Sequence, residues 1–478
     1  MIELNYMEQA VNNLLKLSLF VLGTTAWFSR RHIFNLEDNL VNGRFVEWLN
    51  VALYYADILI IVIVILYLFK TLFEHNKVVW QNAIIWSAII LILYICYQNY
   101  NSDHNNIYSS TKIIFYIIFL FTLINVSRET KNRKAIIWGI IFGALLQSII
   151  GILQFANQSS MNLWIIGEQA LSTEIQNVAE IGIDGIYYLR SYGTLLHPNV
   201  LGGLLVVSII YLLTCFMKDN VSRETNLKDN VSRETMWNKI MFHVKQNKSI
   251  LILIYGILFS SLIFTFSRSA WLALLLTTAI YTFTVAINRK MFHVKHLIYV
   301  AVISFILLIL LNNFVFTRLE QNINITENES VRVNDIQKFS DGFKNNVWFG
   351  TGFGNYIEKL SSNNPEMEWW KLQPIHNSYL LIIVEMGIIG SIIVFGLLIS
   401  IFLITLIVSR ETISNKNVSR ETYTRNILNL LPLLALLVIM IFDHYPWSLD
   451  QGNILLFIVI ALSITRNYKE LDNKLNNM

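Results

Sequence analysis

Long apolar runs recur along almost the whole sequence. A helix needs about 20 predominantly apolar residues to cross the hydrocarbon core of a bilayer. Many runs reach that length, and only 14% of the residues are charged, against roughly 25% in a soluble globular protein. We therefore predict an all-α polytopic membrane protein and exclude a soluble fold.

Hydropathy predicts about twelve transmembrane helices, at residues 12–29, 49–72, 79–98, 109–126, 135–157, 197–217, 249–266, 270–288, 296–316, 376–407, 424–443 and 452–466. An even number places both termini on one side of the membrane. Arg and Lys concentrate in the loops on the side of the termini. We therefore predict a protein of the cytoplasmic membrane with both termini in the cytoplasm. We interpret residues 1–478 as a single membrane domain.

This topology gives two long outer loops, residues 158–196 and residues 317–375, the second between helices nine and ten. Neither has the patterning of an independent domain, so we expect each to fold as a cap on the extracytoplasmic face. Residues 218–248 form a cytoplasmic loop that is enlarged by short repeats.

The repeats are VSRET, which occurs five times, and MFHVK, which occurs twice, with no fixed period. One DNA palindrome, TGTTTCACGTGAAACA, encodes both peptides in different reading frames and resembles a bacterial chromosome-partitioning site. All copies fall in predicted cytoplasmic loops, where insertions are tolerated. We therefore assign their side chains no role in function and predict no nucleic acid partner for the protein itself.

The strongest candidate for chemistry is His376, in WWKLQPIHNSYLLIIVEMGIIG. Pro374 disfavours helix at Ile375, so a helix should begin just after it, capped by Asn377 or Ser378. The histidine would then lie at the water–lipid boundary. A histidine at a helix end is often only structural, but its imidazole titrates near neutral pH and suits a general base. We expect nearby arginines to lower its pKa and keep it neutral.

Two arginines lie next to the extracytoplasmic ends of predicted transmembrane helices. Arg190, in LRSYGTLLHPNVLGG, stands before a turn with His197 and Asn199, and such a turn suits a helix N-terminus that holds an anion. Arg268, in FTFSRSAWLALLL, lies in a tight connection with an apolar setting. The planar fork of an arginine matches the oxygens of a pyrophosphate. The alternatives are an interfacial snorkelling arginine and a turn charge that faces water.

Other residues are weaker candidates. Glu385 lies in the span after His376 and is expected to be a buried structural partner for an arginine, while Asp443 belongs to the last outer turn. The glycines of VWFGTGFGNY predict tight turns better than a nucleotide-binding loop. Cys96 and Cys215 lie in apolar runs without metal-ligand spacing, so we predict no metal site, no disulfide framework and no cofactor.

Together, RSYGTLLHPN, FTFSRSAWL, and GTGFGNY followed by PIHNSYLLIIVEMGIIG resemble the O-antigen ligase-like family of membrane glycan ligases and polymerases, over about residues 185–465. The resemblance implies metal-independent, inverting glycosyl transfer on the outer face of the membrane. It implies a glycan on undecaprenyl pyrophosphate as donor and, as acceptor, either another lipid-linked glycan or a different molecule. The first acceptor would make a polymerase and the second a ligase.

The resemblance also implies residue roles. Arg190 and Arg268 would hold the pyrophosphate and stabilise the charge on the leaving group, and His376 would take the proton of the acceptor hydroxyl. Arg332, in ESVRVNDIQKF, is a further candidate. The alternative function is a flippase or transporter of a lipid-linked precursor. It predicts inverted repeats and ionisable groups near the bilayer midplane, whereas these charges lie at the predicted outer rim.

The repeats yield one test. Deleting residues 220–235, which contain two VSRET copies, should leave glycan transfer unchanged, because the predicted site lies on the other side of the membrane. Transfer in isolated membranes is measured at matched protein level. Lost activity with normal membrane insertion would show that the inserts matter to the protein.

Overall fold

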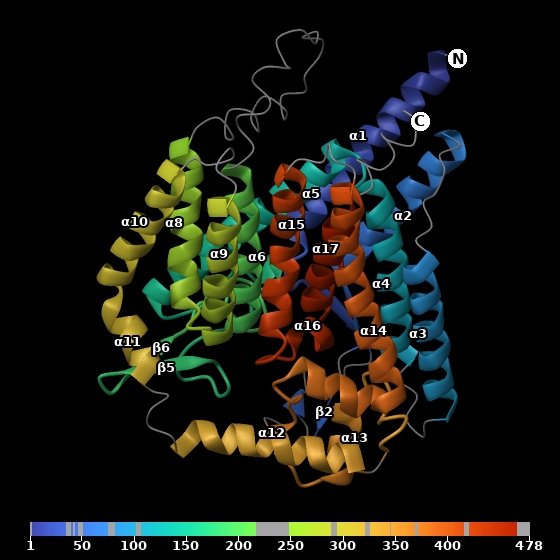
Figure 1. Cartoon of the computed structure of the whole chain (residues 1–478). Coiled ribbons are helices and arrows are strands. Elements are labelled where there is room, and N and C mark those ends of the chain that lie inside the picture. Colours follow the sequence, from blue (N-terminus) through green and yellow to red (C-terminus); the bar gives the residue numbers. More distant parts are fainter. Residues whose placement is uncertain are drawn as a thin grey trace.

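The computed structural model describes residues 2–34, 40–41, 44–45, 51–74, 82–101, 107–216, 248–287, 294–320, 326–344, 346–368, 371–414 and 420–465. Within these ranges the protein is mostly a bundle of long helices (Figure 1). The predicted helical fold is therefore confirmed. The repeats in the loop 218–248 lie outside the described residues, which resume at Lys248, the start of a helix.

Each predicted span overlaps a helix. These helices are α1 (Ile2–Thr25), α2 (Tyr55–Glu74), α3 (Asn82–Asn101), α4 (Ile107–Val126), α5 (Thr130–Asn157), α6 (Pro198–Phe216), α8 (Lys248–Phe264), α9 (Arg268–Ile287), α10 (Val294–Leu310), α14 (Ser378–Ser414), α15 (Arg420–Ile439) and α17 (Asp450–Thr465). Among the described residues, six helices are long and apolar enough to cross a bilayer, or seven if α10 and the helix after it form one span bent by 74°. The full number of twelve crossings remains a prediction.

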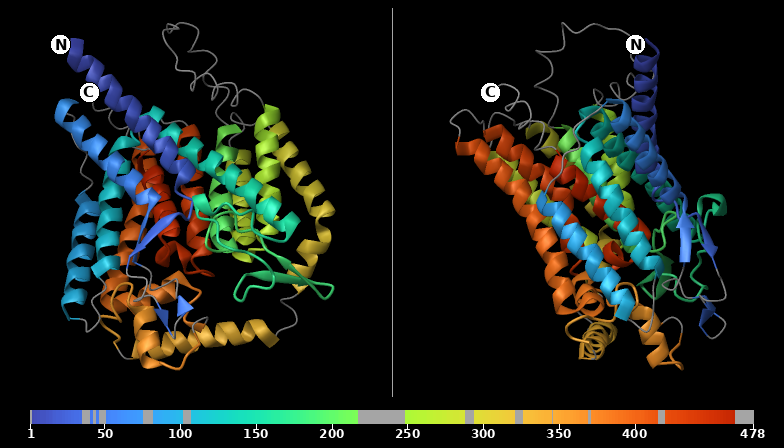
Figure 2. Two further views of the ribbon diagram at one scale, coloured as in Figure 1. Left: turned by 180° about the vertical axis from the view of Figure 1, so that it is seen from behind. Right: turned by 90° about the vertical axis from the view of Figure 1, so that its right-hand side faces the viewer.

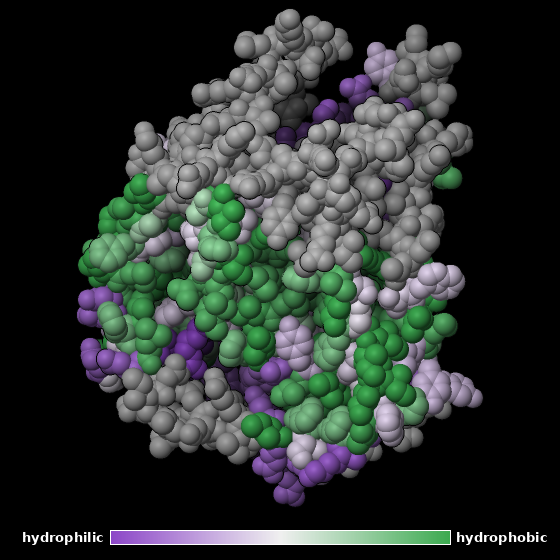
Figure 3. Space-filling model, viewed as in Figure 1, coloured by the Kyte–Doolittle hydropathy of each residue, from purple (hydrophilic) through white to green (hydrophobic). Residues whose placement is uncertain are grey.

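The outer surface of the bundle suits a lipid environment. Large hydrophobic side chains are exposed on several helices, among them Leu68 on α2, Leu93 on α3 and Phe283 on α9. Figure 3 shows hydrophobic residues across the middle of the face in view, with hydrophilic residues below them. An exposed apolar belt of this kind would be unfavourable in water and is stable against lipid.

The N-terminal end of α1 and the C-terminal end of α17 lie at the same end of the bundle. Lys70, near the end of α2, donates to Asn12 of α1 at 2.6 Å and pairs with Glu129 just before α5. Arg133 of α5 donates to Thr465, the last residue of α17, at 3.0 Å. The described start of α1 and the described end of α17 therefore lie at one end of the bundle, whereas the side of the membrane on which the termini lie remains a prediction.

The two predicted caps contain ordered elements that the hydropathy pattern does not predict. Residues 158–196 form the short helix η3 (Trp164–Ile166) and the hairpin of β5 (Glu180–Ile183) and β6 (Ile186–Leu189). Between α10 and α14 lie α11 (Asn312–Glu320), α12 (Thr326–Lys344) and α13 (Tyr356–Asn363), and α12 runs across the end of the bundle (Figures 1 and 2).

The remaining elements are short. β1 (Arg31–Phe34) pairs with β4 (Val51–Tyr54), β2 (Leu40–Val41) pairs with β3 (Arg44–Phe45), and α16 (Tyr445–Ser448) precedes α17. Strands of two to four residues carry too little periodicity to be recognised in the sequence.

Helix α14 is broken at Gly387, and the glycine-rich segment fills the break. Gly387 has φ +62°, and the N–H groups of Ile388 and Ile389 donate to the carbonyls of Val347 and Trp348 at 3.0 and 3.2 Å. The N–H of Gly352 donates to the carbonyl of Glu385 at 3.0 Å. A broken helix is tolerated at membrane depth only where protein satisfies its freed backbone groups.

The predicted tight turns in this segment are confirmed. Gly350, Gly352 and Gly354 all have positive φ. A Cβ atom on Gly350 would lie 2.4 Å from the Glu385 carbonyl oxygen and from the Gly387 nitrogen. The segment can therefore approach α14 this closely only without a side chain at this position.

Replacing Gly350 by alanine should destabilise the protein. The positive φ of +73° costs about 1–2 kcal/mol for a residue with a Cβ, and overpacking against backbone adds about 1–3 kcal/mol. The matched control is Gly185→Ala, because Gly185 has φ +81° but nothing within 4 Å of its Cβ position. Thermal unfolding in detergent should show a clearly larger drop in Tm for Gly350→Ala; equal drops would contradict the close packing.

Candidate functional site

Four segments that are distant in sequence meet at the end of the bundle next to α12. They are the turn before α6, the turn between α8 and α9, the start of α14, and the turn that follows α15. Hydrogen bonds between side chains and backbone join these segments, so the positions of their polar residues are defined by the fold.

The start of α14 places His376. Asn377 caps the helix, because its Oδ1 accepts a hydrogen bond from the N–H of Leu380 at 3.0 Å, as predicted for one of the two candidate caps. Its Nδ2 donates to the carbonyl of Ile441 at 2.8 Å, and Ser378 Oγ donates to the carbonyl of Asp443 at 2.7 Å. The histidine therefore stands directly beside the turn after α15.

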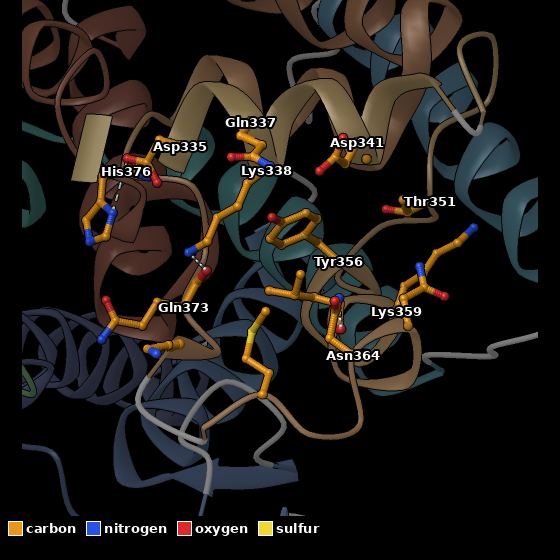
Figure 4. A pocket seen from close by; sticks show the side chains of 15 residues that line it. Asp335, Gln337, Lys338, Asp341, Thr351, Tyr356, Lys359, Asn364, Gln373 and His376 are labelled. Carbon is orange, nitrogen blue, oxygen red and sulfur yellow. Dashed lines mark hydrogen bonds and ion pairs between the residues drawn. The ribbon is translucent and has the colours of Figure 1, made fainter. Parts of the chain in front are cut away.

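The ring of His376 lies between an aspartate and another histidine. Its Nδ1 is 3.3 Å from Oδ2 of Asp335, a residue of α12 (Figure 4). The same oxygen accepts from the backbone N–H of His376 at 3.3 Å. The ring of His444 faces it edge to face, with centroids 5.4 Å apart.

These neighbours set the protonation of His376. Burial alone would lower its pKa, but the carboxylate of Asp335, assisted by that of Asp443, outweighs burial and the opposing charge of Lys338 and raises the pKa above its usual value. Our expectation that arginines lower this pKa is wrong, because carboxylates are the dominant charges around the ring. An aspartate at Nδ1 favours the tautomer that carries the proton there, which leaves Nε2 as an acceptor.

Arg190 lies in a buried hydrogen-bond chain. Its Nε donates to the carbonyl of Thr265 at 2.8 Å and its second guanidinium nitrogen donates to Asn199 Oδ1 at 2.8 Å. Asn199 Nδ2 in turn donates to Asp443 Oδ2 at 2.6 Å. Burial above all, and the charge of Arg268, lower the pKa of Arg190 to about 10, against the opposite influence of Tyr192 and Asp443. The guanidinium therefore remains charged at neutral pH.

A third arginine joins the two that the sequence indicates. Arg268 is the first residue of α9, immediately after the turn whose Thr265 carbonyl binds Arg190. Arg318, from α11, donates through Nε to the next carbonyl, that of Phe266, at 3.2 Å. Three arginines from three segments thus surround one turn, and they form a concentration of positive charge that favours an anion.

His197 has a structural role in this arrangement. It precedes Pro198, the first residue of α6, and its Nδ1 accepts a hydrogen bond from the N–H of Asn199 at 3.1 Å. Burial, then the charges of Arg190 and His376, lower its pKa well below the usual value. His197 is therefore a neutral cap that holds Asn199 in place.

The structure separates Glu385 from these groups. Its carboxylate accepts a hydrogen bond from Trp447 Nε1 at 2.8 Å and is bonded by the backbone amides of Gly354 and Tyr356. The expectation that an arginine is its partner is wrong, because the glycine-rich segment and α16 supply the partners. Arg332 lies in α12, but its side chain is outside the described part of the chain.

Sequence reasoning missed Asp335 and Arg318. Asp335 follows Arg332 by three residues in ESVRVNDIQKF. If this segment is assumed to be a helix, both residues lie near the same face of that helix. Arg318 follows a long apolar run and looks like an ordinary basic flank. Its partner is a backbone carbonyl, which leaves no signal in the sequence.

Beside His376 lies a cavity of about 700 Å³, bounded by α12, α13 and the segment that leads to α14 (Figure 4). His376 forms one end of its lining. Among the described residues, no group of three or more His, Cys, Asp or Glu side chains is placed to hold a metal ion.

The apolar spans are those of a multi-pass membrane protein, and a cluster of charged residues lies at one end of its bundle. Residues 253–395, from α8 into α14, match the family model described as O-antigen ligase, which confirms the resemblance stated above. That stretch of the chain is therefore similar to the O-antigen ligase family. The matched stretch includes Arg268, Asp335 and His376. No curated protein matches the chain.

The raised pKa of His376 predicts how the ring reacts. Its side chain is 35% exposed, so diethyl pyrocarbonate, which needs the neutral imidazole, can reach it. Modification should slow as the pH falls through the raised pKa. In Asp335→Asn this slowing should occur at lower pH, because burial and Lys338 then lower the pKa with only Asp443 opposing them.

Peptide mass spectrometry measures the modification of His376 across pH. Asp341→Asn, on the same helix and cavity wall, is the control and should keep the wild-type profile. An unchanged profile in Asp335→Asn would show that the aspartate does not act on the ring.

Proposed function

We propose that this protein is a glycosyltransferase that moves a glycan from undecaprenyl pyrophosphate to an acceptor hydroxyl, outside the cytoplasm, in the synthesis of a surface polysaccharide. The observation that carries the proposal is the juxtaposition of two different groups of side chains. Three arginines lie on one side, a His–Asp pair lies on the other, and the chain of Arg190, Asn199 and Asp443 connects them.

The arginines suit the donor. A pyrophosphate carries several negative charges, and guanidinium groups bind its oxygens with two parallel hydrogen bonds. Arg190, Arg268 and Arg318 are held by a shared turn, so their charges are in place before the substrate arrives. Preorganised positive charge stabilises a leaving group most strongly when its negative charge increases in the transition state.

His376 suits the acceptor. Its Nε2 would accept the proton of the attacking hydroxyl while Asp335 holds Nδ1–H and stabilises the imidazolium that forms. The acceptor oxygen then forms a bond to the anomeric carbon, and the bond between that carbon and the pyrophosphate oxygen breaks. The electron pair leaves with the pyrophosphate, the anomeric centre is inverted, and the proton remains on the imidazole until it passes to solvent.

The donor supplies the driving force, so the proposal requires neither a nucleotide sugar nor a metal ion nor a cofactor. The partners are the lipid-linked donor, a glycan or lipid-linked acceptor, and the surrounding membrane lipids. A polymerase and a ligase would make the same bond and differ only in the acceptor.

Purified protein, a lipid-pyrophosphate glycan pool and no added metal or nucleotide sugar form the test. His376→Ala should lower the transfer rate by roughly 10²–10⁴-fold, the usual contribution of a general base. Arg268→Lys should also lose activity, because an ammonium keeps the charge but not the planar fork. His32→Ala, a histidine on β1, should behave as wild type.

Product length then separates a polymerase from a ligase. Full activity in folded His376→Ala would overturn the assignment of the base. If vesicles containing the protein move the lipid-linked glycan across the bilayer without any transfer, the chain is a transporter instead.

A further inference from the structure

The cavity beside His376 has a lining unlike that of the arginine cluster. It is lined largely by polar side chains of the segment between α11 and α14, among them Asp335, Lys338, Asn364 and Gln373. Its volume of about 700 Å³ lies within the ~300–1,000 Å³ of typical small-molecule sites. Amide, carboxylate and ammonium groups offer donors and acceptors to a ligand rich in hydroxyls.

Tyr356 shows that the cavity presents hydrogen-bonding capacity that the protein leaves unused. The residue is only 3% exposed, yet its hydroxyl has no hydrogen-bond partner among the described residues. Figure 4 shows this hydroxyl pointing into the cavity on the side of Lys338. Buried polar groups are nearly always paired, so this hydroxyl is placed to form a hydrogen bond with a molecule held in the cavity.

Lys338 adds donors on the same side. Its Nζ donates to the carbonyl of Gln373 at 3.3 Å, and an ammonium has three N–H donors in total. This hydrogen bond holds the ammonium at the cavity wall, between Tyr356 and His376 in the view of Figure 4.

Apolar side chains behind the lining residues hold the walls of this cavity in place. The ring of Tyr356 belongs to a buried apolar cluster with Ile357, Leu372 and Val384. Gly342 of α12 brings that helix close to Val384, since a Cβ atom there would lie 2.8 Å from the valine side chain. Changing a polar tip, such as the hydroxyl of Tyr356, therefore leaves the supporting contacts intact.

We propose that this cavity is the acceptor subsite and that it binds the terminal sugars of a glycan through their hydroxyl groups. The inference rests on the proposed function and extends it to the substrate class. One sugar hydroxyl would reach His376 at the end of the cavity, while the donor pyrophosphate lies among the arginines on the other side of the ring. The acceptor is then recognised by its saccharide and not by its lipid.

The first experiment measures binding without any reaction. Glycan released from the lipid-linked pool by mild acid lacks the pyrophosphate and cannot serve as donor. It should bind wild-type protein in equilibrium dialysis, and Tyr356→Phe should weaken binding about fivefold to tenfold, the effect of one hydrogen bond. Tyr187→Phe, an exposed tyrosine of β6, should bind as wild type. Absent binding, or equal binding by all three proteins, would overturn the subsite.

The second experiment measures transfer with the same released glycan as acceptor. Tyr356→Phe should raise the KM for acceptor and leave kcat and the KM for donor unchanged, which indicates lost binding common to ground and transition states. A rise in donor KM alone would assign the cavity to the donor glycan and overturn the proposal.

The two experiments separate the two proposals. If the glycan binds and Tyr356→Phe weakens that binding, but wild type transfers nothing, the saccharide site stands and the transfer function fails. If transfer occurs and Tyr356→Phe leaves the acceptor KM unchanged, the function stands and the acceptor subsite fails.

Discussion

The arrangement of this site depends on how the fold pairs buried charge at the edge of an apolar bundle. An arginine and an aspartate removed from water are stable only when their hydrogen bonds are satisfied. Asn199 satisfies both at once, since its oxygen accepts from Arg190 and its nitrogen donates to Asp443. One amide thereby joins the turn before α6 to the turn after α15. The backbone carbonyl of Asp443 also accepts a hydrogen bond from Ser378 Oγ. The same chain of hydrogen bonds therefore determines where α14 begins and where His376 stands.

The hydrogen bonds of Asn199 also separate a positively charged group of residues from a negatively charged one. Arg190, Arg268 and Arg318 are bound to or adjacent to the turn between α8 and α9, whereas Asp335 and Asp443 act on His376. A base beside uncompensated arginines would lose its affinity for protons. Carboxylates around the ring restore that affinity, while the positive charge of the arginines is concentrated at the turn between α8 and α9. For the proposed transfer, this separation would let one small region favour both a negatively charged leaving group and a proton acceptor.

Much of this could be predicted from the sequence, and the failures have physical causes. Each span overlaps a helix because span length is a direct consequence of bilayer thickness, and the Asn377 cap follows from Pro374 and local chemistry. Arg190, Arg268 and His376 are recognisable from their place at helix ends. Asp335 was missed, and the pKa of His376 was expected to shift in the wrong direction, because both depend on where α12 lies across the bundle. Contacts made by polar loops carry no periodic signal.

The position of α12 has a consequence for how the site is completed. His376 belongs to the core of the bundle through Asn377 and Ser378, but its partner Asp335 and the cavity wall residue Lys338 both come from α12. The same helix thus supplies the group that raises the basicity of the ring and the group that lines the adjoining cavity. Any displacement of α12 would therefore disturb both the Asp335–His376 pair and the cavity wall at Lys338. In the proposed function, proton transfer and acceptor recognition are therefore coupled through a single helix, whereas the contacts of Arg190 and Arg318 are made with the turn between α8 and α9 and with Asn199.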